Sequence, residues 1–175
     1  MRYIFLAFAA LAFSCSSNRY FIVRHAEKVA LTKDSANMLV SDPPLAEPGK
    51  VRAFVLRNEL QDKNIRYIFS TKYLRNISTV QPLREAVPGA ELIIYNPSKD
   101  SLANFISRLR SIKKGNVLVV GHSNTVDDIV NKICGFTEMD KDLKDSEYDN
   151  LFILQKKKGK TYFTKKKYGY PSNPE

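Results

Sequence analysis

The sequence is poor in the residue types that most often bind transition metals, with only two histidines and two cysteines in 175 residues. The histidines, His25 and His122, and the cysteines, Cys15 and Cys134, form no cluster with the spacing of a zinc site. Cys134 falls on the apolar face of a predicted helix, where we expect plain core. If Cys15 is lipidated, as argued below, no intrachain disulfide remains possible.

Long hydrophobic runs and internal repeats are missing too. No segment is long and apolar enough for an ordinary membrane span, and nothing recurs at a fixed period. The composition, 43% hydrophobic and 26% charged, is typical of a soluble globular protein. A chain of 175 residues can bury a sizeable core, so we expect one domain of ordinary size.

The N-terminal residues differ from the rest of the chain. One basic residue, Arg2, precedes an apolar run from Tyr3 to Phe13, and Ser14 and Cys15 follow. The run is typical of a secretory signal peptide and is too short for a spanning helix. A small residue before a cysteine, followed by Ser-Ser-Asn, also resembles a bacterial lipobox, although the two residues before Ser14 depart from the usual pattern.

We therefore predict that residues 1–14 are removed as a lipoprotein signal peptide and that Cys15 becomes the lipidated N-terminus. Residues 15–175 would then form a single domain, exported to the cell envelope or periplasm and attached to a bacterial membrane through Cys15. The alternative is a plain cleaved signal peptide in which Cys15 is incidental.

The charge is strongly positive, at +10, and much of the excess lies late in the chain, in the stretch QKKKGKTYFTKKKYG. This pattern predicts a β-hairpin that turns near Gly159, or an edge strand protected by lysines. We interpret it as a solvated face and not as a nucleic-acid site. A basic surface would still attract phosphorylated substrates or lie against an anionic membrane.

From residue 19 onward, strand-like and helix-like segments alternate, which predicts a mostly parallel sheet covered by helices on both faces. The segment from 29 to 44 has no clear period and is expected to be a loop beside the site. The predicted strands are 19–23, 66–70, 91–95, 116–120, 150–155 and 160–165, and the predicted helices are 46–60, 72–86, 101–112 and 125–134.

Apolar residues at helical spacing mark the expected buried faces of these helices. Gly135 is the expected C-terminal stop of the last one. The marking residues are Val51, Phe54 and Val55; Leu74, Ile77 and Leu83; Leu102, Phe105, Ile106 and Leu109; and Val126, Ile129, Val130 and Ile133.

Both histidines directly follow strand-like runs. Arg24 and His25 end the first run, His122 ends the run that begins at 116, and Arg75 lies shortly after a third run. Ligands of an open parallel sheet bind outside the carboxyl ends of the strands. We therefore expect two imidazoles and two guanidiniums to converge at that edge.

These side chains suit phosphoryl transfer. The planar fork of arginine matches phosphate oxygens in pairs. A neutral imidazole is nucleophilic near physiological pH, and a covalent intermediate divides one difficult step into two easier ones. The arginines and the second imidazole would stabilise charge on the equatorial oxygens, and this scheme needs no metal or other cofactor.

Three ordered motifs, RHAEK, STKYLR followed by STVQ, and VVGHSNT, resemble those of the histidine phosphatase superfamily, the phosphoglycerate mutase-like proteins. The stretch DPPLAEPGKVRA is similar to the family's usual segment between the first two motifs. The resemblance extends from Tyr20 to about Phe152. It implies a three-layer α/β/α sandwich of the phosphoglycerate mutase-like kind.

The resemblance also implies roles for particular residues. His25 would be the nucleophile that becomes phosphohistidine, and Arg24, Arg75 and His122 would form the catalytic phosphate pocket. Lys28 stands where some members carry another phosphate-binding residue.

One departure from the family concerns the proton donor. Many members carry a glutamate on an insert after the second motif, and this chain is short between Arg75 and Asn116. The sequence leaves several carboxylates open, each with a structural alternative: a solvated helix face, a helix cap, or an acid in the first turn of a helix. These candidates are Glu85, Asp100, Asp127 and Asp128.

Three functions remain open at this point. The first is a metal-independent phosphatase that hydrolyses small phosphomonoesters through phosphohistidine at His25. The second is a protein phosphohistidine phosphatase, since a phosphoramidate leaving group needs less help from an acid. The third is a lipoprotein that binds phosphate or a phosphosugar without catalysis.

Overall fold

The computed structural model describes residues 18–30, 42–157 and 159–172. The predicted signal peptide, Cys15 and most of the 29–44 segment lie outside these described residues. No helix within them is long and apolar enough to span a membrane.

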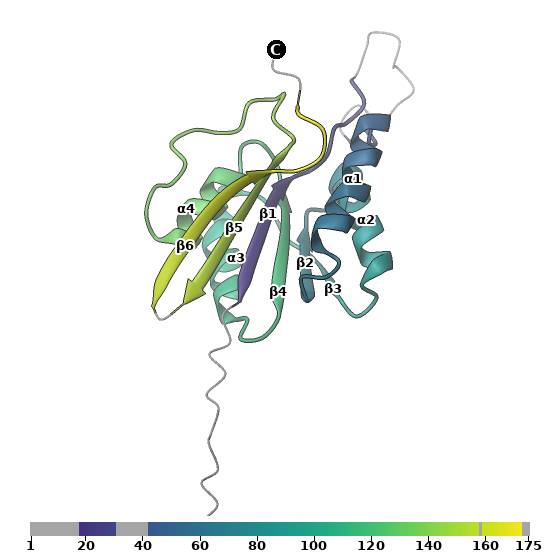
Figure 1. The fold of residues 1–175 in the computed structure, drawn as a ribbon. Helices are drawn as coiled ribbons and strands as arrows, with labels where there is room; N and C mark the ends of the chain where they lie inside the picture. Colours follow the sequence, from purple (N-terminus) through teal and green to yellow (C-terminus); the bar gives the residue numbers. More distant parts are fainter. Residues whose placement is uncertain (1–17, 31–41, 158, 173–175) are drawn as a thin grey trace, which may run out of the picture.

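A six-stranded sheet forms the centre of the molecule, in the order β3-β2-β4-β1-β5-β6 (Figure 1). The first four strands in this order are mutually parallel, whereas β5 pairs antiparallel with β1 and β6 antiparallel with β5. The strands are β1 (Arg19–Arg24), β2 (Ile65–Ser70), β3 (Glu91–Ile94), β4 (Asn116–Gly121), β5 (Asn150–Lys157) and β6 (Lys160–Lys167).

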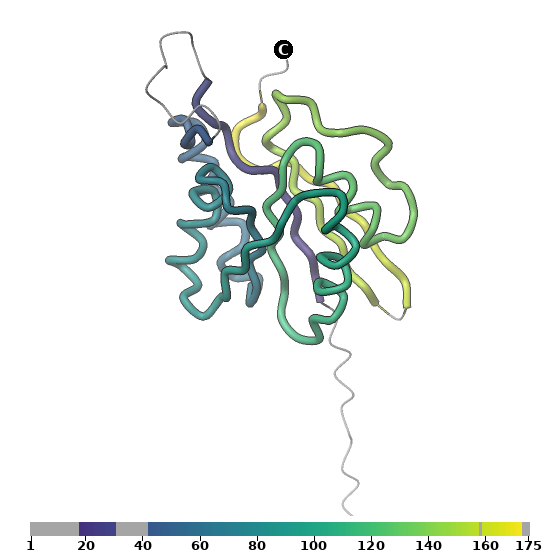
Figure 2. The backbone as a smooth tube through the Cα atoms, turned by 180° about the vertical axis from the view of Figure 1, so that it is seen from behind, coloured from purple at the N-terminus to yellow at the C-terminus, as the bar shows by residue number. Residues whose placement is uncertain are grey.

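Two pairs of helices cover the two faces of this sheet (Figures 1 and 2). Strand side chains alternate between the faces: Ile22 belongs to the core with α3 and α4, and Val23 to the core with α1 and α2. The helices are α1 (Glu47–Leu60), α2 (Leu74–Ala86), α3 (Lys99–Ser111) and α4 (Val126–Cys134). This is the predicted three-layer α/β/α sandwich with a mostly parallel sheet.

The elements match the predicted ones within two residues at most ends. The hairpin at Gly159 is present, with that glycine at φ 75°, and β6 forms the edge of the sheet with exposed lysines. Gly135 ends α4 in the left-handed conformation, at φ 87°. Cys134, the last residue of α4, is buried in the core, as expected.

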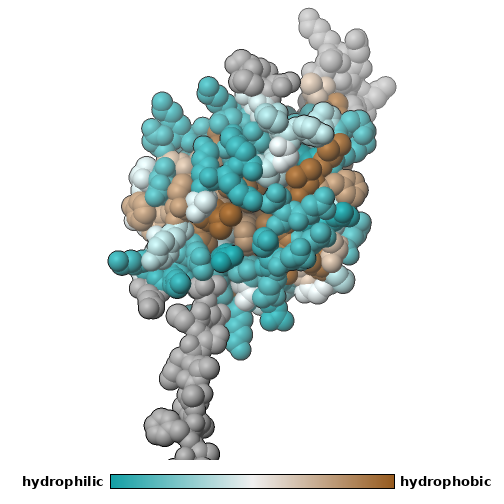
Figure 3. All heavy atoms as spheres, viewed as in Figure 1, coloured by the Kyte–Doolittle hydropathy of each residue, from teal (hydrophilic) through white to brown (hydrophobic). Residues whose placement is uncertain are grey.

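The predicted buried faces are right for α3 and α4 but mostly wrong for α1, where Val55 packs against the core and the other two marking residues do not. Val51 and Phe54 are about half exposed, at 47% and 52%, and Figure 3 shows hydrophobic side chains gathering on the surface over α1. The buried face of α1 instead carries Arg52, Ala53 and Leu56. The apolar pattern did not predict this buried face because Arg52 is buried together with an acidic partner, which is described below. In α2, Leu74 is likewise exposed, and Asn76 and Thr79 are buried beside Val80 and Leu83.

Candidate active site

The carboxyl ends of β1, β2 and β4 bring the two histidines together. His25 directly follows β1 and His122 directly follows β4, and the His25 backbone N–H donates to the Gly121 carbonyl at 3.0 Å. The two imidazole rings lie 5.5 Å apart, centroid to centroid. Arg75, in the first turn of α2, enters the same region from the end of β2.

A pocket of about 900 Å³ opens at this edge of the sheet. It holds every site residue that the sequence predicted: Arg24, His25, Lys28, Arg75 and His122. The rest of the lining includes Lys72, Tyr73, Asp145 and the segments 94–98 and 123–125. Among these residues, Asp145 had no signal in the sequence.

His25 is held as a neutral imidazole whose Nε2 makes no hydrogen bond with the residues that the structure describes. Its side chain is 3% exposed, and its Nδ1 lies 2.8 Å from the backbone carbonyl oxygen of Ala26. A carbonyl can only accept, so Nδ1 carries the hydrogen and Nε2 keeps its lone pair. Burial, with smaller contributions from the nearby Arg24 and His122, lowers the pKa of His25 from 6.5 to about 3.

His122 is neutral for the same reason. Burial, followed by the positive charges of Arg75 and Arg24, lowers its pKa to about 4. Its Nε2 lies 3.1 Å from the Thr71 hydroxyl oxygen, and its ring meets the ring of Tyr73 edge-on at 5.3 Å. Thr71 and Tyr73 follow β2, so the second motif orients the histidine of the third.

Arg24 is 3% exposed and is fixed by the segment before β5. One terminal nitrogen, Nη1, donates to the Lys144 and Asp145 carbonyls at 2.8 and 2.9 Å. The other, Nη2, lies 3.3 Å from Asp145 Oδ1, and the guanidinium stacks 4.1 Å above the Tyr148 ring. Its Nε is buried with no hydrogen-bond partner among the described residues.

Arg75 has a similar arrangement. Its Nη1 donates to Asp42 Oδ1 at 3.2 Å, and its guanidinium lies 4.4 Å from the centre of the Tyr73 ring. The same Asp42 carboxylate accepts the Leu74 backbone N–H at 2.9 Å and so fixes the start of α2. The Nε of Arg75 is also buried without a partner among the residues that the structure describes.

The electrostatics of the pocket favour an anion. The guanidinium groups of Arg24 and Arg75 each retain a buried Nε–H without a partner among the described residues, and the exposed Lys28 and Lys72 add positive charge to the same lining. Unpaired buried donors are costly, so such groups mark a site where a ligand completes the hydrogen bonds. An oxyanion with several acceptor oxygens, such as phosphate, meets this requirement.

A second ion pair fixes the backbone that carries His25. Arg52 is 4% exposed and donates from Nε and Nη2 to the carboxylate of Glu27, at 2.6 to 2.9 Å. Its Nη1 donates to the Tyr168 carbonyl at 2.8 Å. The segment after β1 is therefore tied both to α1 and to the chain beyond β6, which explains the buried cation on α1.

None of the four carboxylates left open by the sequence lines the pocket. Glu85 is exposed on α2, where it accepts from Gln81, and Asp100 is exposed in the first turn of α3. Asp127 and Asp128 lie in the first turn of α4 and are absent from the lining. Of the described carboxylates, Asp145 is the one that lines it.

No group of three or more histidine, cysteine or acidic side chains within the described ranges could hold a metal ion. The lining itself offers two imidazoles, cationic groups and a single carboxylate, a donor set that suits an anion and not a cation.

No family model and no curated protein matches this sequence. The fold, however, is found in many solved structures. A candidate phosphohistidine phosphatase, SixA, of Agrobacterium tumefaciens superposes with a TM-score of 0.61 at 16% identity, covering 88% of this chain and 99% of that one. A phosphoglycerate mutase of Bacillus anthracis gives a TM-score of 0.59 at 15% identity, covering 86% and 92%.

A mycobacterial glucosyl-3-phosphoglycerate phosphatase gives a TM-score of 0.58 at 12% identity, covering 84% of this chain and 97% of that one. These similarities establish that the chain has the phosphoglycerate mutase-like fold, in agreement with the family resemblance of the three motifs.

Proposed function

We propose that this protein is a metal-independent phosphatase that hydrolyses small phosphomonoesters through a phosphohistidine at His25. The observation that carries the proposal is the convergence of two neutral imidazoles and two guanidiniums with unpaired donors on one pocket. The phosphatases and mutases that share the fold support the same chemistry.

In the first step, the lone pair on His25 Nε2 attacks phosphorus, and the bond from phosphorus to the ester oxygen breaks. The hydrogen bond from Nδ1 to the Ala26 carbonyl stabilises the positive charge that develops on the ring. Arg24, Arg75 and His122 surround the phosphoryl oxygens and stabilise their charge in the transition state.

In the second step, a water oxygen attacks phosphorus and the phosphorus–nitrogen bond breaks. The electron pair of that bond returns to Nε2, inorganic phosphate leaves, and His25 is again the neutral imidazole of the resting site.

We propose Asp145 as the proton donor to the leaving oxygen and as the base for the water. Its side chain is 94% exposed, and its Oδ1 lies 3.3 Å from Arg24 Nη2 in the resting site. A phosphate oxygen that binds Arg24 would displace this carboxylate and leave it beside a dianion. The displaced carboxyl group would then be free to approach the leaving oxygen of the ester.

The test is rapid acid quenching after mixing the enzyme with a labelled aryl phosphate. Wild-type protein should accumulate protein-bound, acid-labile phosphate, and His25→Asn should form none. His122→Asn is the matched control, because it removes a buried imidazole of the same pocket but keeps the nucleophile, so slow labelling should persist. Equal turnover by wild type and His25→Asn would refute the mechanism.

A protein phosphohistidine phosphatase is the second candidate, since the candidate SixA structure is covered over 99% of its length. Turnover of a phosphohistidine peptide should be compared with that of p-nitrophenyl phosphate on the same preparation. A large preference for the peptide would favour this candidate. Phosphate-protected melting without hydrolysis of any substrate would favour a binding protein instead.

The cellular location is a separate proposal, and it is supported by residues 1–15 alone. We propose that the protein is exported and anchored in the cell envelope through a lipid on Cys15. Wild-type protein expressed in a bacterium should fractionate with membranes, and Cys15→Ser should become soluble or stay uncleaved. Unchanged fractionation of the variant would contradict the lipid anchor.

A further inference from the structure

Exposed basic side chains gather where the parallel strands begin, at the end of the sheet away from the pocket. Arg19 pairs in register with Gln155, and Lys157 with Lys160, so the β5–β6 turn lies beside the start of β1. The Asn116 side chain accepts a hydrogen bond from the Arg19 backbone N–H and donates one to the Lys63 carbonyl. These two hydrogen bonds join the starts of β1, β2 and β4. We name this surface the strand-start face; its basic residues are Arg19, Lys63, Arg66, Lys113, Lys114, Lys156, Lys157 and Lys160, all exposed.

Positive charge predominates on this face. Asp62 and Glu91 are the carboxylates of its strand starts and turns, and Glu138, like Lys156, lies near Cys134 at the end of α4. An ordinary solvated surface intersperses both signs, whereas a one-sign cluster produces a field that attracts an extended anionic partner.

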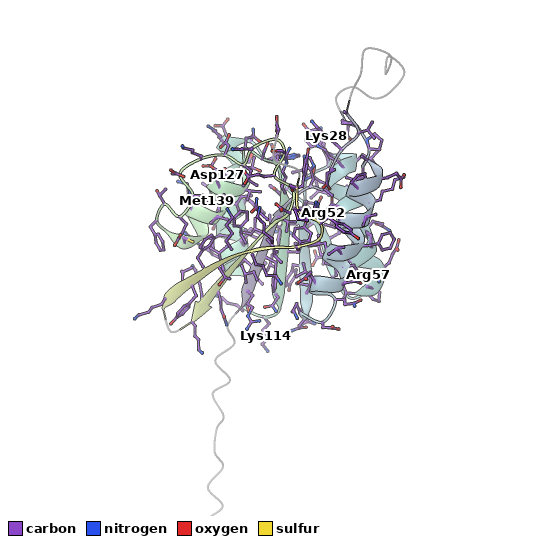
Figure 4. The ribbon with its side chains drawn as sticks, turned by 45° about the horizontal axis from the view of Figure 1, so that its top comes forward. Lys28, Arg52, Arg57, Lys114, Asp127 and Met139 are labelled. Atoms are coloured by element: carbon purple, nitrogen blue, oxygen red, sulfur yellow. The ribbon has the colours of Figure 1, made fainter. Side chains whose placement is uncertain are left out.

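The strand-start face does not serve the pocket. β1 runs for six residues from this face to Arg24, a length of roughly 20 Å. Figure 4 shows Lys114 at one end of the molecule and Lys28, which lines the pocket, at the other. The attraction of a small substrate therefore does not explain the basic cluster.

The N-terminal sequence joins the domain at this same face. Asn18, the first described residue, donates from its side chain to the Ile112 carbonyl, at the end of α3 next to Lys113 and Lys114. The apolar sequence 3–13 and Cys15 precede it closely in the chain. An apolar or lipidated segment and a basic patch together are the two signals that give stable binding to a membrane surface.

We propose that the strand-start face binds the anionic headgroups of a lipid bilayer and holds the pocket on the side away from the membrane. Each lysine close to an anionic bilayer strengthens binding by about fivefold. Nucleic acid, the other extended polyanion, would make no use of a lipid on Cys15, three residues before Asn18 in the chain.

The test uses the full chain with Cys15→Ser, so that no lipid is attached, and measures cosedimentation with vesicles. Pure phosphatidylcholine vesicles are compared with vesicles containing about one third phosphatidylglycerol. The apolar N-terminal sequence contributes to both, so the informative quantity is the ratio of the two partition coefficients.

We expect this ratio to exceed about tenfold at low salt and to fall as salt rises. Replacing Lys63, Lys114, Lys157 and Lys160 by alanine should reduce it at least about tenfold. The matched control replaces Lys50, Lys99, Lys141 and Lys144, which are also exposed but lie outside the strand-start face and the pocket lining, and should retain most of the ratio.

Phosphatase turnover, measured on the same samples, should be unchanged by the four strand-start substitutions and by vesicle binding. A ratio near one for the unsubstituted chain, or an equal loss in the control, would overturn the proposal. Displacement of the protein from anionic vesicles by equimolar RNA would assign the face to nucleic acid instead. If His25→Asn loses turnover but still binds the vesicles, membrane binding does not depend on the proposed function, and either proposal can fail without the other.

Discussion

Acidification should destabilise this protein in a way that its two histidines control. Both imidazoles are buried and have a lowered pKa in the folded state, about 3 for His25 and about 4 for His122, against 6.5 for an unperturbed histidine. Between pH 6.5 and these values, both histidines are protonated in the unfolded chain but stay neutral in the folded chain. Stability therefore rises with pH in this window and is lost as the pH falls.

The size of the effect follows from the two values. At pH 5 an unfolded histidine with a pKa of 6.5 is almost fully protonated, which favours unfolding by about 2 kcal/mol relative to a site that stays neutral. At pH 7 the same term is only about 0.2 kcal/mol. Lowering the pH from 7 to 5 should therefore remove nearly 2 kcal/mol for each histidine, and almost 4 kcal/mol for both.

Urea unfolding at pH 7 and pH 5, in buffers without phosphate, measures this loss. Carboxylates elsewhere in the chain also titrate, so the informative comparison is with His25→Asn, His122→Asn and the double variant. Each single variant should lose about 2 kcal/mol less than wild type between the two pH values, whatever its stability at pH 7. Wild type and the double variant losing the same amount would refute neutral, buried imidazoles.

Further predictions concern the groups around the histidines. Arg75→Ala should abolish the rise in melting temperature that phosphate produces and lower kcat/KM by about 10²-fold to 10³-fold, whereas Arg57→Ala, a half-buried residue of α1 outside the pocket lining (Figure 4), should change neither. Asp145→Asn should slow alkyl phosphates far more than aryl phosphates, whose leaving groups need little protonation; equal slowing would exclude it as the proton donor. Arg52→Ala should cost about 3–5 kcal/mol in the urea assay, because it leaves a partly buried carboxylate unpaired. Phe54→Ser should change stability by no more than about 0.5 kcal/mol, since the side chain is half exposed.

The sequence predicted those parts of the fold and pocket that depend on local pattern. Strand and helix limits followed from hydrophobic period, and the two histidines were located at strand ends because a buried run stopped at a polar residue. The parallel arrangement then required those ends to share one edge. Arg24 and Arg75 could be included because each lies in or beside the same motifs.

Asp145, which lines the pocket, and Asp42, which holds Arg75, could not be found in this way. Asp42 and Asp145 lie in segments without helical or strand period, and each meets its arginine partner across more than 30 residues of sequence. The buried face of α1 was misassigned for a related reason. The charge of Arg52 is neutralised by Glu27, which lies 25 positions earlier, and nothing in the local pattern indicates this ion pair. Pairings of this kind depend on tertiary contact, which hydrophobic period does not encode.

Asp145, the proposed proton donor, makes a contact in the resting site that the sequence does not predict. In the absence of substrate, the Asp145 carboxylate pairs with Arg24 Nη2, and a bound anion would compete with it for this nitrogen. The carboxylate is almost fully exposed, so little burial energy opposes its departure, whereas the guanidinium is held by backbone carbonyls and the Tyr148 ring. Substrate binding should therefore move the carboxylate and leave the arginine in place. Under the role proposed for Asp145, this exchange would bring a carboxyl group to the bound ester without the glutamate-bearing insert that many members of the family carry.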